Sequence, residues 1–215
     1  MNWIKKCLLS LPFLRASKVG PLPTSPSSSA LSTKSFTPAP NTIARAEASK
    51  PKSKSGLLKS YPETKAKTPN VSAKPITPKA IVLHHSGGSY AGGVAWIKNS
   101  ASRVSYHCLV APDGKRTVFA NPEQRTWHAG RSEWRGKRDL NSWSVGAAFA
   151  GDTYKQPLTD AAMASMAEYL APIMQRHRLT LNDVTDHRTV SPGRKDDLNP
   201  VELARFKKYL TARLA

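Results

Sequence analysis

The stretch "AIVLHHSGG", residues 80 to 88, carries the strongest structural signal in the sequence. An apolar run is followed by two histidines and a glycine pair, and a continuous apolar run bounded by glycines is typical of a central β-strand covered on both faces. Successive side chains of a strand point to opposite faces, so His84 and His85 face opposite ways. Only one of the two histidines can enter a given site.

Strand and helix patterns alternate after this run. Such an alternation, with no internal repeat, predicts a β-sheet with helices packed on it. The expected elements are a short helix in residues 94–102, a β-hairpin in 104–120 about the turn "PDGK", a long polar loop in 125–142 and a strand in 142–150.

The remaining residues predict two helices and one short strand. Thr159 is placed to cap a helix whose apolar residues recur at helical spacing, and residues 181–187 form a strand-like segment that ends on His187. Asn199 is placed to cap the last helix, with proline directly after it. We therefore expect an α/β fold, with a single domain at residues 77–215 built on a central mixed β-sheet flanked by helices.

The composition of the N-terminal third differs from that of the rest. Residues 1–80 contain 14 Lys and Arg against two acidic residues, and 11 of the 17 prolines. This stretch has too little apolar surface to offset the entropy of ordering its backbone, so we expect a disordered basic linker at residues 17–76. Residues 1–80 supply 12 of the 19 net positive charges. Such a charge favours an anionic partner (a nucleic acid, an anionic membrane or a cell-wall polymer), unless the segment is only a solvated tail.

The first 16 residues, "MNWIKKCLLSLPFLRA", have the order of a short signal-like or membrane-associating segment. The apolar run is short, Pro12 interrupts it, and it is too short to span a bilayer as a helix. The chain has two cysteines, Cys7 and Cys108, which do not define a disulfide framework.

Three groups of residues with catalytic chemistry fall at expected strand ends or in loops. These are His84, His187 and the acidic pair Asp196 and Asp197. Two imidazoles and one carboxylate, with a fourth position left to water, describe a catalytic zinc site. Zinc lowers the pKa of water and polarises a carbonyl, which suits hydrolysis of an amide.

The ordered set of motifs resembles one known family. "IVLHHS", "WIKNSASRVSYHCLV", "TWHAG", "NSWSVG" and "DHRTVSPGRKDD" occur in the order found in zinc-dependent N-acetylmuramoyl-L-alanine amidases of the type-2 family. That family includes bacteriophage lysis enzymes and is related to peptidoglycan-recognition proteins. The resemblance covers residues 79–212. It implies a zinc cofactor, a peptidoglycan substrate and an enzyme of the bacteriolytic, endolysin-like kind with antimicrobial action.

The resemblance also assigns the metal ligands. His84 matches the first ligand, His187 the second and Asp197 the third, which leaves Asp196 as the neighbour that does not ligate. Lys195 matches a lysine that in relatives helps to hold the oxyanion formed as water attacks, a role that its positive charge can serve.

One departure from the family concerns the general base. Many members carry a glutamate in the strand that here reads "SVGAAFAG", where Ala148 occupies the expected position. Other members lack that glutamate and carry a tyrosine before a histidine in the second strand, which "SYHCLV" reproduces at Tyr106. We therefore expect Tyr106 and Lys195 to be catalytic, unless Tyr106 is only a packing aromatic. His85, Trp127 and His128 are expected to contact the substrate.

Two functions remain open at this level. The leading hypothesis is a peptidoglycan hydrolase that cleaves the amide between N-acetylmuramic acid and the L-alanine of the stem peptide. The alternative is a non-catalytic peptidoglycan-binding module, which the absence of the glutamate at position 148 motivates. We expect a monomer that acts in the periplasm or cell wall, after export or release during phage lysis. Its basic tail would bind anionic envelope polymers or a membrane surface, whereas no recognition motif supports a nucleic-acid partner.

Overall fold

The computed structural model describes residues 60–215. The signal-like segment expected at residues 1–16 and the part of the expected linker at residues 17–59 lie outside the described residues.

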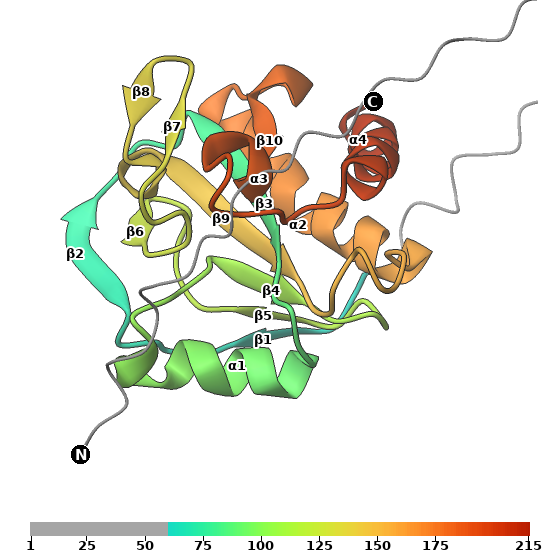
Figure 1. Ribbon diagram of the computed structural model, residues 1–215. Helices are drawn as coiled ribbons and strands as arrows, with labels where there is room; N and C mark the ends of the chain where they lie inside the picture. The colour runs from blue at the N-terminus through green and yellow to red at the C-terminus, as the bar shows by residue number, and fades with distance from the viewer. Residues whose placement is uncertain (1–59) are drawn as a thin grey trace, which may run out of the picture. The chain divides into compact units, whose positions relative to one another are not determined.

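A six-stranded mixed sheet forms the centre of the domain (Figure 1). All neighbouring strands run parallel except the hairpin pair β4 and β5, which is antiparallel. The strands, in spatial order, are β1 (Glu63–Lys65), β5 (Arg116–Val118), β4 (Cys108–Val110), β9 (Ser144–Phe149), β3 (Ala80–His85) and β10 (Val184–Asp186).

Within residues 60–215, four α-helices and two small antiparallel sheets surround the central sheet. The helices are α1 (Tyr90–Lys98), α2 (Asp160–His177), α3 (His187–Val190) and α4 (Pro200–Leu214). The small sheets pair β2 (Val71–Pro75) with β6 (Gln124–Thr126), and β7 (Glu133–Trp134) with β8 (Lys137–Arg138). Short 3-10 turns lie at Ser100–Ser102, Leu140–Ser142 and Leu181–Asp183.

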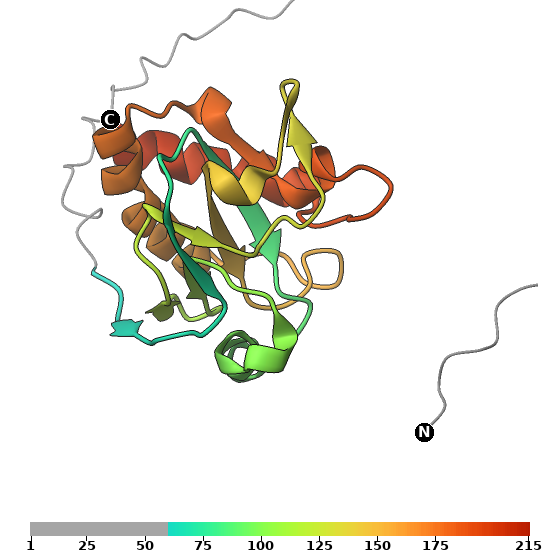
Figure 2. The same cartoon turned by 90° about the vertical axis from the view of Figure 1, so that its left-hand side faces the viewer.

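Alternation along the strands divides the core between the two faces of the sheet. In β3, Ile81 and Leu83 pack into the cluster that α2 and α4 cover, with Met166 and Phe206 among its members. The intervening residues Ala80 and Val82 belong to a second cluster on the opposite face. Figures 1 and 2 show the strands lying between α1 and the pair α2 and α4. His84 therefore emerges on the face that α2 and α4 leave uncovered.

The starts expected for the last two helices are confirmed, whereas the short helix expected at residues 94–102 begins earlier, as α1 at Tyr90. The Thr159 side chain accepts a hydrogen bond from the backbone N–H of Ala162 at the start of α2. The Asn199 side chain accepts one from Val201 at the start of α4, with Pro200 in the first turn. Each side chain satisfies a backbone donor that the helix itself cannot pair. The mixed α/β fold is likewise confirmed.

The boundary expected between linker and domain at residues 76 and 77 is wrong. Strands β1 and β2 lie within the stretch assigned to the linker, and β1 pairs with β5 at the edge of the central sheet. Glu63 accepts a 2.8 Å hydrogen bond from Arg116, whose buried guanidinium also donates to Glu168 of α2 at 3.0 Å. The ordering of β1 thus depends on a partner far along the chain, which local composition does not reveal.

The loop expected at residues 125–142 is also more ordered than predicted, because it contains β7, β8 and the end of β6. The hairpin expected in residues 104–120 is confirmed, although each of its strands has only three residues. Within the described residues, no helix combines the length and hydropathy that a bilayer span requires.

Candidate metal centre and active-site cavity

Adjacent parallel strands bring the two candidate imidazole ligands together. Val184, Thr185 and Asp186 of β10 lie opposite Ile81, Val82 and Leu83 of β3, in that order. One further step along both strands places His187 beside His84. Because parallel strands end at the same edge of a sheet, these two histidines lie together despite a separation of 103 residues.

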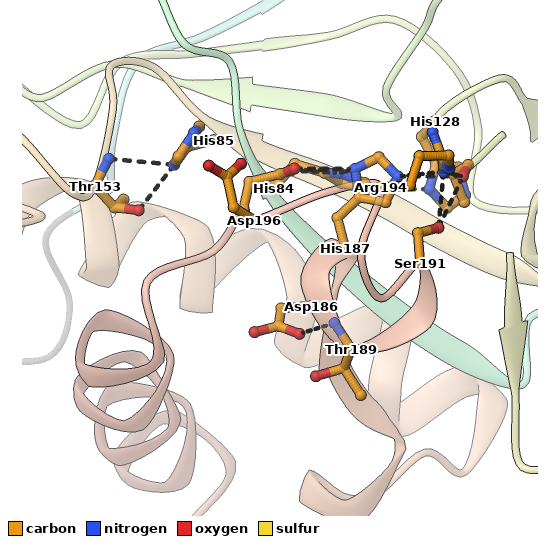
Figure 3. A network of polar contacts seen from close by, with 12 residues as sticks. His84, His85, His128, Thr153, Asp186, His187, Thr189, Ser191, Arg194 and Asp196 are labelled. Atoms are coloured by element: carbon orange, nitrogen blue, oxygen red, sulfur yellow. Dashed lines mark hydrogen bonds and ion pairs between the residues drawn. The ribbon is translucent and has the colours of Figure 1, made fainter. Parts of the chain in front are cut away.

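The third candidate, Asp197, lies in the loop between α3 and α4 and is held by the backbone. The N–H of Arg188 donates to the carbonyl oxygen of Asp197 at 2.5 Å. Asp186 caps α3 by accepting from the N–H of Thr189 at 2.7 Å, as Figure 3 shows. The turn that carries His187 is therefore fixed at its start and tied to the loop that carries Asp197.

Three candidate ligand atoms form a nearly equilateral triangle. The Nδ1 atoms of His84 and His187 are 3.0 Å apart, and Asp197 Oδ2 lies 3.1 Å from the first and 3.2 Å from the second. All three residues are buried. The three residues that the sequence nominated as metal ligands thus converge at one point. Asp196, the neighbouring aspartate that is not expected to ligate, is exposed.

Two neighbours of opposite character contact Nε2 of His187. The carbonyl oxygen of Ala129, 3.1 Å away, can only accept, whereas a guanidinium nitrogen of Arg194, 3.2 Å away, can only donate. Ligation of a metal through Nδ1 requires the N–H on Nε2, where the Ala129 carbonyl is placed to accept it.

The charge states at the triangle suit a divalent cation. Burial and the neighbouring His187 lower the pKa of His84 to about 4, so His84 is neutral at pH 7. Burial alone would raise the pKa of Asp197, but hydrogen bonds with His187 and His84 hold it well below its usual range. A neutral imidazole at His84 and an ionised carboxylate at Asp197 are the protonation states in which these groups ligate metals.

The donor set fits zinc better than a hard cation. Tetrahedral zinc with ligands at about 2.0–2.2 Å requires ligand atoms roughly 3.3 Å apart, close to the spacing found here. Imidazole nitrogen also favours zinc over magnesium or calcium, which prefer oxygen ligands. His84, His187 and Asp197 therefore fit a three-ligand zinc site.

His85 faces away from this triangle, as the alternation of strand side chains predicts. Its Nδ1 contacts the Thr153 hydroxyl at 2.8 Å, and the two residues lie apart from His84 and its partners in Figure 3. Thr153 in turn accepts from the backbone N–H of Asn199 at 3.0 Å. His85 thereby connects the end of β3 to the segment that follows Asp197, while it also lines the neighbouring cavity.

A cavity of about 460 Å³ opens next to the candidate metal centre. Its lining includes both candidate catalytic residues, Tyr106 and Lys195, together with Trp127, His187 and Asp197. The Tyr106 ring lies 5.1 Å from the His84 ring, measured between centroids. Burial, and then the charge of Asp197, raise the pKa of Tyr106 far above its usual range, so the phenol keeps its proton.

The placement of Tyr106 differs from the expectation, whereas that of Trp127 agrees with it. Tyr106 lies two residues before β4 rather than within a strand. Trp127 is half-buried beneath the guanidinium of Arg125, which lies 4.4 Å above the indole centroid. A cation over an indole face stabilises both groups, so this tryptophan forms a fixed part of the cavity wall.

Ala148 lies at the position where many relatives carry a glutamate. It is directly opposite His84 in the pairing of β9 with β3, and its side chain is fully buried in a cluster with Ile97, Leu109 and Phe119. An alanine at this position cannot transfer a proton. Of the two residues expected to be catalytic, Tyr106 is the one whose ring contacts His84.

Two residues beside the site have contacts that the sequence did not predict. His128, expected to contact the substrate, is 4% exposed and lies behind His84, and both ring nitrogens of His128 contact residues of the domain. Arg194 donates to the carbonyl oxygens of Ala129 and Arg131 at 2.6 and 3.1 Å. Both residues lie within motifs that drew attention in the sequence, but only the distances reveal what they contact.

His107 is a buried histidine whose ring contacts are all within the domain. It is fully buried, accepts from the backbone N–H of Gly146 at 3.0 Å and donates to the carbonyl oxygen of Gln124 at 2.8 Å. Burial lowers the pKa of His107 from 6.5 to about 4. It therefore packs as a neutral ring beneath the site.

A family model described as N-acetylmuramoyl-L-alanine amidase (Amidase_2) matches residues 73–200. Among curated proteins, the chain is 34% identical over 111 residues to the 1,6-anhydro-N-acetylmuramyl-L-alanine amidase AmpD of Haemophilus influenzae, covering 51% of this chain and 59% of that protein. It is 30% identical over 138 residues to the N-acetylmuramoyl-L-alanine amidase AmiD of Escherichia coli, covering 57% of this chain and 49% of that protein. The chain thus spans less than two thirds of the length of these relatives.

Solved structures support the same fold. The crystal structure of a selenomethionine AmpD derivative superposes with a TM-score of 0.61 at 24% sequence identity. The match covers 69% of this chain and 94% of that structure.

Acidification of the metal-free protein provides a test of the buried His107. Above pH 6.5 this imidazole is neutral in both folded and unfolded chains, and between about pH 6.5 and 4 only the unfolded chain takes up the proton. The folded pKa is depressed, so stability falls as the pH falls through this window, by up to roughly 3 kcal/mol for this residue. In urea unfolding with chelator present, His107→Gln should lose correspondingly less stability on acidification than the parent. Equal losses would show that another group carries the effect.

Proposed function

The chain belongs to the N-acetylmuramoyl-L-alanine amidase family, whose model matches residues 73–200, and from this membership we propose that it cleaves the amide between N-acetylmuramic acid and L-alanine in peptidoglycan. The observation that carries the proposal is the convergence of His84, His187 and Asp197 beside a cavity lined by Tyr106 and Lys195. We propose residues 60–215 as the catalytic domain.

We propose zinc as the cofactor, held by Nδ1 of His84, Nδ1 of His187 and a carboxylate oxygen of Asp197. When bound at such a site, zinc supplies Lewis acidity toward a carbonyl and toward water. The carboxylate leaves one unit of net positive charge on the divalent ion, which keeps the centre attractive to a carbonyl oxygen. All three ligands come from one chain, which supports action as a monomer; sedimentation velocity tests that state.

Tyr106 and Lys195 are proposed to act on the scissile amide. The neutral Tyr106 phenol has a proton to donate, and it lies next to His84 on the cavity side of the centre. It can therefore hydrogen-bond the attacking water or relay a proton to the leaving nitrogen. Lys195, exposed at the same cavity, brings a positive charge to the oxyanion that develops on the carbonyl.

The cavity wall is proposed to position the substrate. Of the three side chains expected to contact the substrate, His85 and Trp127 line the cavity and are proposed to do so, whereas His128 lines it with only 4% of its surface exposed. Trp127 offers an indole face held in place by Arg125, and an apolar face of this kind can stack on a sugar ring or pack against the lactyl group. His85 reaches the rim near Thr153.

Zinc dependence is tested by a matched pair of variants. Asp197→Asn removes a ligand charge, whereas Asp196→Asn alters the adjacent exposed carboxylate. We expect the parent and Asp196→Asn to bind one zinc per chain, and Asp197→Asn to lose it, as measured by metal analysis after dialysis. The parent with zinc should release stem peptides from cell-wall sacculi, and chelation should stop the release. Binding to sacculi without release of product would instead favour a non-catalytic peptidoglycan-binding module.

The role of Tyr106 is tested by Tyr106→Phe, which removes the hydroxyl and keeps the ring. If the phenol takes part in proton transfer, kcat should fall by about 10²–10⁴-fold while zinc stoichiometry is unchanged. A packing aromatic would tolerate the change with little effect. Steady-state kinetics on a soluble muropeptide separate the two roles.

The basic N-terminal segment is proposed to attach the enzyme to anionic envelope polymers or a membrane surface. Residues 1–80 carry 12 net positive charges, which supports such a role, and the substrate places the activity in the periplasm or cell wall. Removing residues 1–59 should leave the rate on soluble muropeptides intact and weaken attachment to whole cells in a salt-sensitive way. Salt-independent attachment, or an equal loss on both substrates, would contradict the proposal.

A further inference from the structure

His128 lies on the side of His84 that faces away from the candidate metal centre. Its Nδ1 is 3.1 Å from Nε2 of His84, whereas the opposite ring nitrogen of His84 faces His187 and Asp197. The two rings meet edge to face, with their centroids 5.3 Å apart. His128 therefore contacts the nitrogen of His84 that does not ligate.

A short chain of hydrogen bonds determines which nitrogen of His128 carries the proton. The Ser144 hydroxyl donates to the carbonyl oxygen of Leu140 at 2.6 Å, and this uses its only hydrogen. Ser144 Oγ lies 3.3 Å from Nε2 of His128, so toward this ring it can only accept. Nε2 of His128 must then carry the N–H, and its Nδ1 is an acceptor.

The two neighbours of His84 favour different positions of its proton. Because Nδ1 of His128 accepts, it favours the N–H on Nε2 of His84. The Asp197 carboxylate, 3.1 Å from Nδ1 of His84, accepts only and favours the N–H on Nδ1 when no cation lies between them. Metal binding requires a lone pair on Nδ1, and His128 is the neighbour that accepts the proton on Nε2 in that tautomer.

The backbone around His128 is shaped to hold the ring in this position. Gly146 of β9 lies beneath it, and a Cβ at that residue would come within 2.2 Å of His128 Cγ. The backbone N–H groups of His128 and Ala129 both donate to Asn141 Oδ1, at 3.0 and 2.8 Å. Ser144 and Gly146 lie on the same face of β9, so one strand supplies both the hydrogen-bond partner and the space.

We propose that His128, oriented by Ser144, is a positioning residue that biases His84 toward the tautomer whose Nδ1 can bind the metal. This role differs from the substrate contact expected of His128 from the sequence. The inference rests on the proposed zinc centre for its effect on activity, whereas the tautomer itself can be observed without metal.

The direct observation is the ¹⁵N spectrum of the histidine side chains in the full-length, metal-free chain above pH 8. Because His128 accepts from Nε2 of His84, a substantial fraction of His84 should carry its proton on Nε2 even though Asp197 faces Nδ1. In Ser144→Ala, which keeps both rings but removes the hydroxyl that accepts from His128, that fraction should fall. Unchanged His84 signals in this variant would overturn the proposal, whether or not zinc binds the parent.

Zinc affinity provides the second measurement. Loss of a residue that orients a metal ligand typically weakens metal binding by 10–100-fold, and we expect His128→Phe to have an effect of that size. His128→Asn, whose amide oxygen can accept from His84, should recover part of the affinity. The control is His177→Phe, the same change at the last residue of α2, where the histidine contacts Glu123. This variant should leave the zinc affinity unchanged.

Kinetics distinguish the positioning role from a substrate contact. A raised KM with unchanged zinc affinity in His128→Phe would assign His128 to the substrate and overturn the proposal. Should His128→Phe fail to fold, as judged by its near-ultraviolet circular dichroism, the Ser144→Ala spectrum and its zinc titration still decide the question. A parent chain that binds no zinc would defeat the proposed function, while the His84 spectrum would still report on the tautomer.

Discussion

The pairing of β3 with β10 is the constraint on which the rest of the site depends. Because these strands are parallel neighbours in a fixed register, the residues that follow each strand emerge side by side at one edge of the sheet. A slip of one residue would exchange His84 for His85 and direct the wrong imidazole toward His187. The apolar side chains of β3 prevent such a slip, since it would also move Ile81 and Leu83 out of the core formed with α2 and α4. The packing that stabilises the domain therefore also selects the metal-facing histidine.

Strand β9 contributes to the site through residues that are small. Ser144, Gly146 and Ala148 occupy the face of β9 that carries His84 on the neighbouring strand, and they lie opposite Ala80, Val82 and His84 in turn. Serine provides an acceptor, glycine provides room for a ring, and alanine leaves the space beside His84 without a second carboxylate. The positive charge of a bound metal would then be offset by Asp197 alone, and the polar groups of Tyr106 and Lys195 would face the substrate without a competing acid.

The sequence predicted the parts of the fold and site that depend on local pattern. Alternation in "AIVLHH" was sufficient to predict that His84 and His85 diverge, and capping residues located the starts of α2 and α4. Contacts between distant segments could not be predicted in this way. Strand β1 has the sequence Glu-Thr-Lys, with no apolar residue, and its place in the sheet depends on the hydrogen bond from Arg116 to Glu63, 53 residues away. The sequence likewise could not predict the role of Ser144. Deciding which nitrogen of His128 carries the proton requires the distances from Ser144 to Leu140 and to His128.

The position of β1 has a consequence for how the protein can work at a surface. β1 and β10 form opposite edges of the six-stranded sheet, so the chain joins the domain at the edge that is farthest, in strand order, from His187. Under the proposed function, the segment before β1 would hold the domain by one edge of the sheet, while His187 of the candidate metal centre follows the strand at the other edge.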